Sequence, residues 1–356
     1  MEHATYGIII SIVESTGSDM AQKRVTIVEI AKEAGVSAQT VSRVVNGHSN
    51  VAETTRQQIQ EIIDRLGYHP SRLARSLLQG RSHTIGIVSY GLGLFGPSQT
   101  LAGIVNEANQ QRYSVLPQVL NDPKTNDVDE LIGTLIEYHV DGIIWAIPEI
   151  GDNRSGLAEA IAQVNLPCVF INSQPRPDFT VANIDNLFGG RVATQHLIDQ
   201  GYRAIGLISG PSDWWEASER MQGWRETMAL NGLAINEALV KSGDWSAAAG
   251  ERAMCEMLNT NPEVEAVFAC NDSMALGAIK AGRAAGRRIP DDLAVIGFDD
   301  VPEAAFFTPA LSTIRQPFDI LGSRAVAEVE RQVQQADIKT ELSISIKPTL
   351  IVRSST

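Results

Sequence analysis

Cysteine is scarce in this chain of 356 residues, and long apolar runs are missing from it. The three cysteines, Cys168, Cys255 and Cys270, are odd in number and lack the spacing of metal ligands. This usage argues against a disulfide framework and favours a reducing, cytoplasmic compartment. No apolar stretch reaches the ~20 residues that cross a bilayer, and the run at 8–13 lacks the preceding positive charge of a signal peptide.

Catalytic signatures are missing as well. The sequence shows no nucleophile–base pair, no metal-ligand cluster and no phosphate-binding loop. The histidines at 83, 139 and 196 are scattered along the chain. We therefore expect a protein that is not an enzyme and that holds neither a cofactor nor a metal.

The net charge of −13 looks unfavourable for nucleic-acid binding, but it is unevenly distributed. Residues 20–81 contain nine Lys and Arg against five Asp and Glu, whereas the chain beyond residue 81 contains 20 basic and 34 acidic residues. A basic head on an acidic body lets one end approach phosphates while the body avoids non-specific adhesion.

Residues 25–47 predict two short helices joined by a tight turn. Thr26 and Glu29 stand three residues apart and match a capping box at the start of the first helix. Gly35 supplies the positive φ that a sharp turn between helices needs. Ser37 then caps the second helix.

The second helix, 38–46, buries its valines and presents polar side chains that include Arg43. A helix of this kind in a helix-turn-helix fits the major groove of DNA. A third helix, 53–66, completes a small apolar core, and the breaker at 68–70 ends the head.

From residue 83 the pattern changes to apolar strands that alternate with helices. The predicted strands are 85–89, 114–119, 142–146, 168–172, 181–184, 205–209, 267–269 and 293–298. The predicted helices are 98–111, 127–138, 155–163, 187–200, 216–230, 246–258, 272–285 and 319–334. Continuous apolar runs between helices indicate parallel sheets covered on both faces. Because the pattern restarts after about Val181, we predict an α/β body of two doubly wound lobes, with a ligand in the cleft between them.

The sequence thus divides into four predicted parts. These are a disordered extension at 1–22, a helix-turn-helix domain at 23–69, a hinge helix at 70–82 and the two-lobed body at 83–353. All charged residues before Met20 are acidic. We expect Met20 to be the natural start of the protein.

Head, hinge and body together resemble the lactose-repressor (LacI/GalR) family of bacterial transcription regulators, and above all the member that names it. The resemblance runs from about Lys23 to Arg353, and its most specific stretches are AGVSAQTVSRVVNG (34–47), GDWSA (243–247), NDSMALGA (271–278) and GFDD (297–300). It implies a cytoplasmic homodimer that represses carbohydrate genes on operator DNA and is released by a sugar bound in the periplasmic-binding-protein-like body. The namesake's tetramer-forming leucine tail is missing here, which favours a dimer.

The resemblance also indicates which residues contact DNA. In the head and hinge they are Thr26, Ser37, Gln39, Thr40, Ser42, Arg43, Asn46, Ala74 and Leu77. Arg43 suits a bidentate contact with guanine and Gln39 one with adenine. Leu77 matches the family's wedge, an apolar side chain that enters a base step and kinks the duplex.

For the effector, the resemblance and the chemistry of the side chains point to one set of residues: Tyr90, Asn172, Arg220, Trp245, Asn271, Asp299 and Phe318. Arg220 and Asp299 can each grip two neighbouring hydroxyls, and Trp245 offers a flat apolar face to a sugar ring. Tyr90, Asn172 and Glu216 differ from the namesake's residues. We therefore expect the effector to be a sugar, but not specifically a β-galactoside. Trp214 and Trp215 are either further stacking platforms or a packed lid.

Two other functions remain as alternatives. The segment 91–96, GLGLFG, matches the G-x-G-x-x-G of dinucleotide-binding oxidoreductases. Pro97 directly after the third glycine and the basic head both argue against that function. A sugar-binding transport protein would share the two-lobed body, but it needs an export signal and no DNA-binding head.

Overall fold

The computed structural model describes residues 25–45, 47, 49–68, 80–122, 128–164, 166–177, 179–334 and 343–356. The chain forms two compact units that meet between Gly80 and Arg81, inside the predicted hinge at 70–82. The remaining hinge residues and the extension at 1–22 lie outside the described residues. Among those described, no helix combines the length and apolarity that crossing a membrane requires.

The first unit contains the three predicted helices, α2 (Ile27–Ala34), α3 (Ala38–Val45) and α4 (Glu53–Leu66). Ile30, Val41 and Ile59, one from each helix, have no exposed surface and form the centre of its core. The helical period of these apolar positions is what brings the three faces together.

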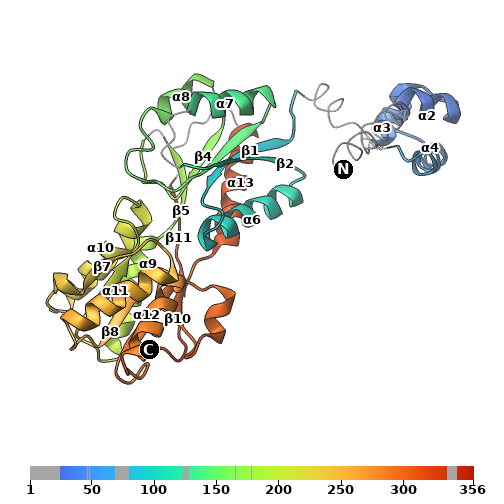
Figure 1. The fold of residues 1–356 in the computed structure, drawn as a ribbon. Helices are drawn as coiled ribbons and strands as arrows, with labels where there is room; N and C mark the ends of the chain where they lie inside the picture. The colour runs from blue at the N-terminus through green and yellow to red at the C-terminus, as the bar shows by residue number, and fades with distance from the viewer. Residues whose placement is uncertain are drawn as a thin grey trace, which may run out of the picture. The chain divides into compact units, whose positions relative to one another are not determined.

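The second unit consists of two lobes, each built on a six-stranded sheet (Figure 1). The strands of the first lobe are β1 (Thr84–Tyr90), β2 (Ser114–Leu120), β3 (Gly142–Ala146), β4 (Cys168–Ile171), β5 (Thr180–Ile184) and β11 (Ser343–Ile346), in the parallel order β11-β5-β4-β3-β1-β2. Its helices are α6 (Phe95–Gln110), α7 (Val128–Glu137), α8 (Leu157–Val164) and α13 (Phe318–Gln334). Apolar side chains of α6 and α13 cover one face of the sheet, and those of α7 and α8 cover the other.

The second lobe repeats this arrangement with another sheet, ordered β12-β10-β9-β8-β6-β7. Its strands are β6 (Ile205–Ser209), β7 (Val240–Ser242), β8 (Ala266–Ala269), β9 (Ala294–Asp299), β10 (Ser312–Arg315) and β12 (Thr349–Ile351), of which β12 alone runs antiparallel to its neighbour. Its helices are α9 (Asn186–Asp199), α10 (Trp215–Leu230), α11 (Ala247–Thr260) and α12 (Asp272–Ala284), with short 3₁₀ turns η1 (Glu237–Leu239) and η2 (Pro302–Phe306).

Helix α9 packs closely on α10, the helix that carries Arg220. A Cβ added to Gly190 of α9 would lie 2.4 Å from the carbonyl oxygen of Arg220. Only glycine permits this approach of the two backbones, and the approach fixes the height of Arg220 above the sheet.

The chain crosses between the lobes three times, after β5, after β10 and after β11. The prediction of two doubly wound lobes is therefore confirmed, with two corrections. The first lobe also includes the predicted helix 319–334 and the strand β11, which return to it from far along the chain. Strands β7, β10, β11 and β12 were not predicted, because they have only three or four residues and β11 alternates half-buried with exposed positions.

Candidate functional site

The first candidate site is the exposed face of α3. Thr26 and Glu29 form the predicted capping box of α2, with 2.8 Å between the backbone N of Thr26 and Oε2 of Glu29. Gly35 follows with φ of 66° and turns the chain into α3. Both features fix the angle at which α3 leaves α2.

Ser37 caps α3, since its hydroxyl accepts from the backbone N–H of Thr40 at 3.1 Å. The two hydroxyls also hydrogen-bond each other at 2.9 Å, so both serve the helix start. Ser42 is partly buried on the same helix. Asn46, Ala74 and Leu77, the remaining predicted DNA contacts, lie outside the described residues.

Gln39 and Arg43 are the two fully exposed polar side chains among the predicted contacts of α3. They stand four residues apart, so they share one face of the helix. Within the described part of the chain neither makes a hydrogen bond or an ion pair. Val41 and Val44 hold the opposite face in the core, which leaves this pair free for a partner.

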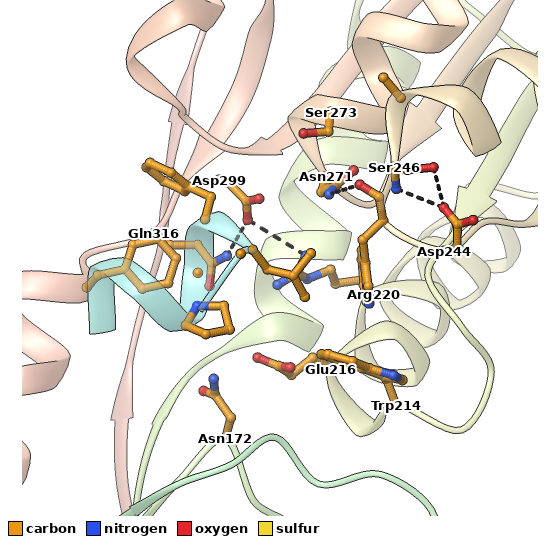
Figure 2. Close-up of a pocket in the computed structure, with 18 residues that line it drawn as sticks. Asn172, Trp214, Glu216, Arg220, Asp244, Ser246, Asn271, Ser273, Asp299 and Gln316 are labelled. Carbon is orange, nitrogen blue, oxygen red and sulfur yellow. Dashed lines mark hydrogen bonds and ion pairs between the residues drawn. The ribbon is translucent and has the colours of Figure 1, made fainter. Parts of the chain in front are cut away.

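The second candidate site is a cavity of about 340 Å³ between the two lobes (Figure 2). This volume lies at the low end of small-molecule sites, which span ~300–1,000 Å³. The lining residues are Gly93, Leu94, Phe95, Gly96, Pro97, Asn172, Trp214, Glu216, Arg220, Asp244, Trp245, Ser246, Ala247, Asn271, Ser273, Asp299, Gln316 and Phe318. Six of the seven predicted effector residues are therefore brought together.

Arg220 is almost completely buried in this cavity and is held from several sides. Its Nε donates to Oδ1 of Asn186 at 2.8 Å, and its Nη1 donates to the carbonyl oxygen of Cys270 at 2.5 Å. Its Cζ lies 3.8 Å from the centre of the Phe298 ring. These contacts fix the guanidinium before any ligand arrives, which lowers the entropic cost of binding.

Asp299 ends β9 beside this guanidinium, with 3.9 Å between Oδ1 and Nη1 of Arg220. Gln316 donates from Nε2 to the same Oδ1 at 2.6 Å. Burial raises the pKa of Asp299 to about 6, against the opposing effects of Arg220 and Gln316. The second oxygen, Oδ2, takes part in neither contact and is available to accept from a ligand hydroxyl.

Asn271 and Trp245 are linked to each other. Asn271 caps α12 through Oδ1, which accepts from the N–H of Met274 at 2.8 Å. Its Nδ2 donates to the carbonyl oxygen of Trp245 at 2.9 Å, where φ is 71°. The amide thus holds the Trp245 backbone in place, and the ring meets Trp214 edge to face, with 5.6 Å between ring centres.

The first lobe and the crossings supply the remaining predicted side chains. Asn172 directly follows β4 in the left-handed region, at φ of 53°. Phe318 begins α13 and meets Phe95 edge to face at 5.8 Å. Tyr90 is not among the described residues that line this cavity, and its contact with the effector stays a prediction. The Tyr90 side chain packs against the apolar clusters of both lobes.

Some lining residues escaped the sequence prediction. Asp244, Ser246 and Ser273 lie within two residues of Trp245 or Asn271 in the sequence. They belong to the motifs GDWSA and NDSMALGA, which carry the family resemblance and could have indicated them. Residues 93–97, which include two glycines of the segment 91–96, also line the cavity at the start of α6. That position accounts for these glycines without a dinucleotide.

In the ranges that the structure describes, no group of three or more His, Cys, Asp or Glu side chains is placed to hold a metal ion.

The chain is similar to known proteins over nearly its whole length. A model of the bacterial regulatory proteins of the lacI family matches residues 26–71, and a model of periplasmic binding protein-like domains matches residues 194–356. The HTH-type transcriptional regulator CelR of Thermobifida fusca is 34% identical over 94% of this chain and 99% of its own length.

Two solved structures extend the comparison. A Lac repressor dimer bound to operator and the anti-inducer ONPF has a TM-score of 0.83 at 30% identity, covering 94% of this chain and 99% of its own. A complex of the transcriptional regulator CelR with cellobiose has a TM-score of 0.70 at 31% identity, covering 94% of this chain and all of its own.

Proposed function

This chain belongs to the lacI family of bacterial regulatory proteins, and from that premise we propose that it is a transcriptional repressor whose grip on DNA is controlled by a sugar. The observation that carries the proposal is the presence, in one chain, of an unpartnered Gln39–Arg43 face and a preorganised cavity around Arg220 and Asp299. The relatives are regulators and not enzymes, which removes the oxidoreductase alternative. The head removes the transport-protein alternative.

On the DNA side, α3 enters the major groove and reads bases with Gln39 and Arg43. Ser37, Thr40 and Ser42, at the start and flank of α3, then serve phosphates and orient the helix. A similar protein has been solved on its operator. The cytoplasm, where the DNA is, is the compartment in which this function takes place.

On the effector side, the cavity binds a sugar and the occupied body releases the operator. Arg220, Asp299 and Asn271 present donors and acceptors at fixed positions, while Trp245 and Phe318 provide apolar faces. A similar regulator has been solved with cellobiose. A neutral sugar fits this combination of preorganised polar groups and aromatic walls.

The repressor acts as a homodimer, because one recognition helix reads only half of a palindromic operator. Two large apolar side chains of the second lobe lie exposed on neighbouring elements: Leu276 on α12 and Phe306 on η2, the latter 85% exposed. Arg283 of α12 donates to the carbonyl oxygen of Thr308, which ties these elements together. We assign this surface to the contact between subunits.

The test selects binding sites from a library of random DNA duplexes with the intact protein. We expect enrichment of an inverted repeat, and release of that repeat by at least one mono- or disaccharide. The Arg43→Ala variant should select no repeat while it remains folded, because Arg43 contacts nothing in the core. If the intact protein shows no preference for any sequence at moderate salt, the proposal is wrong.

A further inference from the structure

The cavity has a second polar end, away from Asp299. Asn172, which follows β4 in the first lobe, and Glu216, in the first turn of α10 in the second lobe, both line it. Figure 2 shows these two side chains together at one edge of the cavity, with Asp299, Asn271 and Ser273 toward the opposite edge. Any ligand that fills the space therefore meets side chains of both lobes at this end.

Glu216 is the unusual member of this pair. The residue is only 9% exposed, yet its carboxylate forms no hydrogen bond with any residue that the structure describes. Burial of a carboxylate without hydrogen-bond partners is costly. The other cavity acids differ in this respect: Asp299 accepts from Gln316, and Asp244 accepts from Ser246.

Charges around the cavity are unbalanced. Three carboxylates line it, those of Glu216, Asp244 and Asp299, against the single guanidinium of Arg220. The exposed Asp244 pairs with Arg252 outside the lining, which leaves Glu216 and Asp299 with Arg220 inside. Arg220 already donates to Asn186 and Cys270 and lies beside Asp299. Arg154 of the first lobe is not in the described lining, and its guanidinium donates to Ile147, Asn153 and Ser173 and not to Glu216.

We infer that Glu216 and Asn172 form a specificity subsite that accepts hydrogen bonds from a hydroxyl or ammonium group of the sugar and excludes sugars with phosphate or carboxylate groups. The inference rests on the proposed sugar effector and names its chemical class. A neutral or amino sugar gives Glu216 the donors it lacks, and Asn172 supplies one donor group and one acceptor. An anionic sugar brings a further negative charge next to Glu216, where the one cation of the described lining, Arg220, is already engaged by Asn186, Cys270 and Asp299.

The edge-to-face pair Trp214 and Trp245 lies close to this end of the cavity. Aromatic faces attract sugar C–H groups and also an ammonium group. The volume of about 340 Å³ limits the occupant to a small sugar. The aromatic pair and the volume therefore suit a compact neutral or amino sugar.

The experiment measures binding of matched sugars by calorimetry. The probes are glucose, galactose, lactose and cellobiose, with glucosamine, galactosamine, glucuronate, galacturonate and the 1- and 6-phosphates of glucose and galactose. Burial raises the pKa of Glu216 to about 7, while Arg220 and Arg154 oppose that shift and Asp299 adds to it. The titrations are therefore run at pH 8, where the carboxylate is ionised.

The variants are Glu216→Gln, which keeps the shape and removes the charge, and Glu219→Gln as a control on the same helix outside the cavity lining. In the unmodified protein and in the control, we expect every anionic sugar to bind at least about tenfold more weakly than its neutral counterpart. In Glu216→Gln the difference should shrink to less than about threefold. Each comparison is a ratio within one variant, so a general loss of stability does not affect it.

Two results would overturn the inference. One is equal binding of an anionic sugar and its neutral counterpart by the unmodified protein. The other is an unchanged ratio in Glu216→Gln. If none of the probes binds the unmodified protein, the sugar effector itself is wrong, and the subsite is wrong with it.

Discussion

The backbone N–H of Trp215 in the second lobe donates to the carbonyl oxygen of Glu149 in the first lobe, with 3.0 Å between the two atoms. Next to this bond, Gly151 donates to the carbonyl oxygen of Asp213, and Ile150 pairs with Trp214 as an isolated antiparallel bridge. These backbone contacts join the lobes away from the three crossings, at the start of the helix that carries Glu216 and Arg220. They place Glu149 at the contact of the lobes.

The side chain of Glu149 anchors this region, because it is 3% exposed and accepts from Ser173, Gln174 and Arg176. Replacement by leucine leaves buried donors without an acceptor, so we expect Glu149→Leu to lower the free energy of unfolding by about 3–5 kcal/mol. Glu149→Gln, which keeps one acceptor oxygen, should lower it by about 1–3 kcal/mol. Urea unfolding followed by circular dichroism measures both.

A surface pair provides the matched control. Glu226 also pairs with an arginine, Arg191, through contacts of 2.5 and 2.9 Å, but the carboxylate side chain is 33% exposed, against 3% for Glu149. We expect Glu226→Gln to change the unfolding midpoint little, since exposed pairs contribute little to stability. If Glu149→Gln and Glu226→Gln lowered the free energy of unfolding equally, burial of the Glu149 network would not contribute to stability.

Protonation of Glu216 should make stability depend on pH. The pKa of this carboxyl rises from an ordinary value of 4.5 to about 7 on folding, mainly because of burial. Between these values the folded state holds a proton that the unfolded state has released, so stability falls as pH rises from about 4.5 through 7. We expect the melting temperature of the unmodified protein to fall relative to that of Glu216→Gln over this range.

Differential scanning fluorimetry at pH 5, 6, 7 and 8, without ligand, tests this. Asp299, whose pKa also rises on burial, is present in both proteins, so to a first approximation its contribution cancels in the difference. Parallel curves for the two proteins would mean that Glu216 does not change its pKa on folding.

Local patterns made much of this fold predictable from sequence. The capping box at Thr26, the turn at Gly35 and the limits of α4 depend on neighbouring residues, and the structure reproduces them. The short strands β11 and β12 are different, because residues far away in the chain determine their pairing.

The site shows the same limit. Side-chain chemistry and family resemblance pointed to Arg220, Asn271 and Asp299, which the fold brings to one cavity. Tyr90, which the resemblance also indicated, packs against the apolar clusters outside that lining. The sequence marks Glu216 only as a difference from a relative. That it is buried and lacks a hydrogen-bond partner follows from the packing of two lobes, which no local pattern encodes.

Arg43 should control sequence recognition and not folding. Its exposed guanidinium makes no contact in the described residues, so Arg43→Lys should unfold at the same urea concentration as the unmodified protein. Lysine keeps the charge but loses the bidentate geometry for guanine. We expect discrimination against a substituted guanine to fall by about 1–3 kcal/mol, measured by fluorescence anisotropy on the selected operator and its single-base variants.

Affinity of Arg43→Lys for random duplex should stay nearly constant, because phosphate contacts dominate non-specific binding. An equal loss of affinity for all duplexes would show that Arg43 contacts phosphates and not bases.

Phe306 and Leu230 allow a paired test of the subunit contact. Both are strongly exposed, at 85% and 83%, but Phe306 belongs to the surface assigned to the subunit contact, with Leu276 on α12, and Leu230 ends α10. A charge at the centre of an apolar interface is costly when the subunits bury it. We expect Phe306→Asp to shift the protein from dimer to monomer in sedimentation velocity at micromolar concentration, and Leu230→Asp to leave it a dimer.

The monomer should bind the operator more weakly, since half of the DNA contacts are lost. It should still bind the sugar, because the residues that line the cavity all belong to one chain. A Phe306→Asp protein that remains a dimer would place the interface elsewhere on the body.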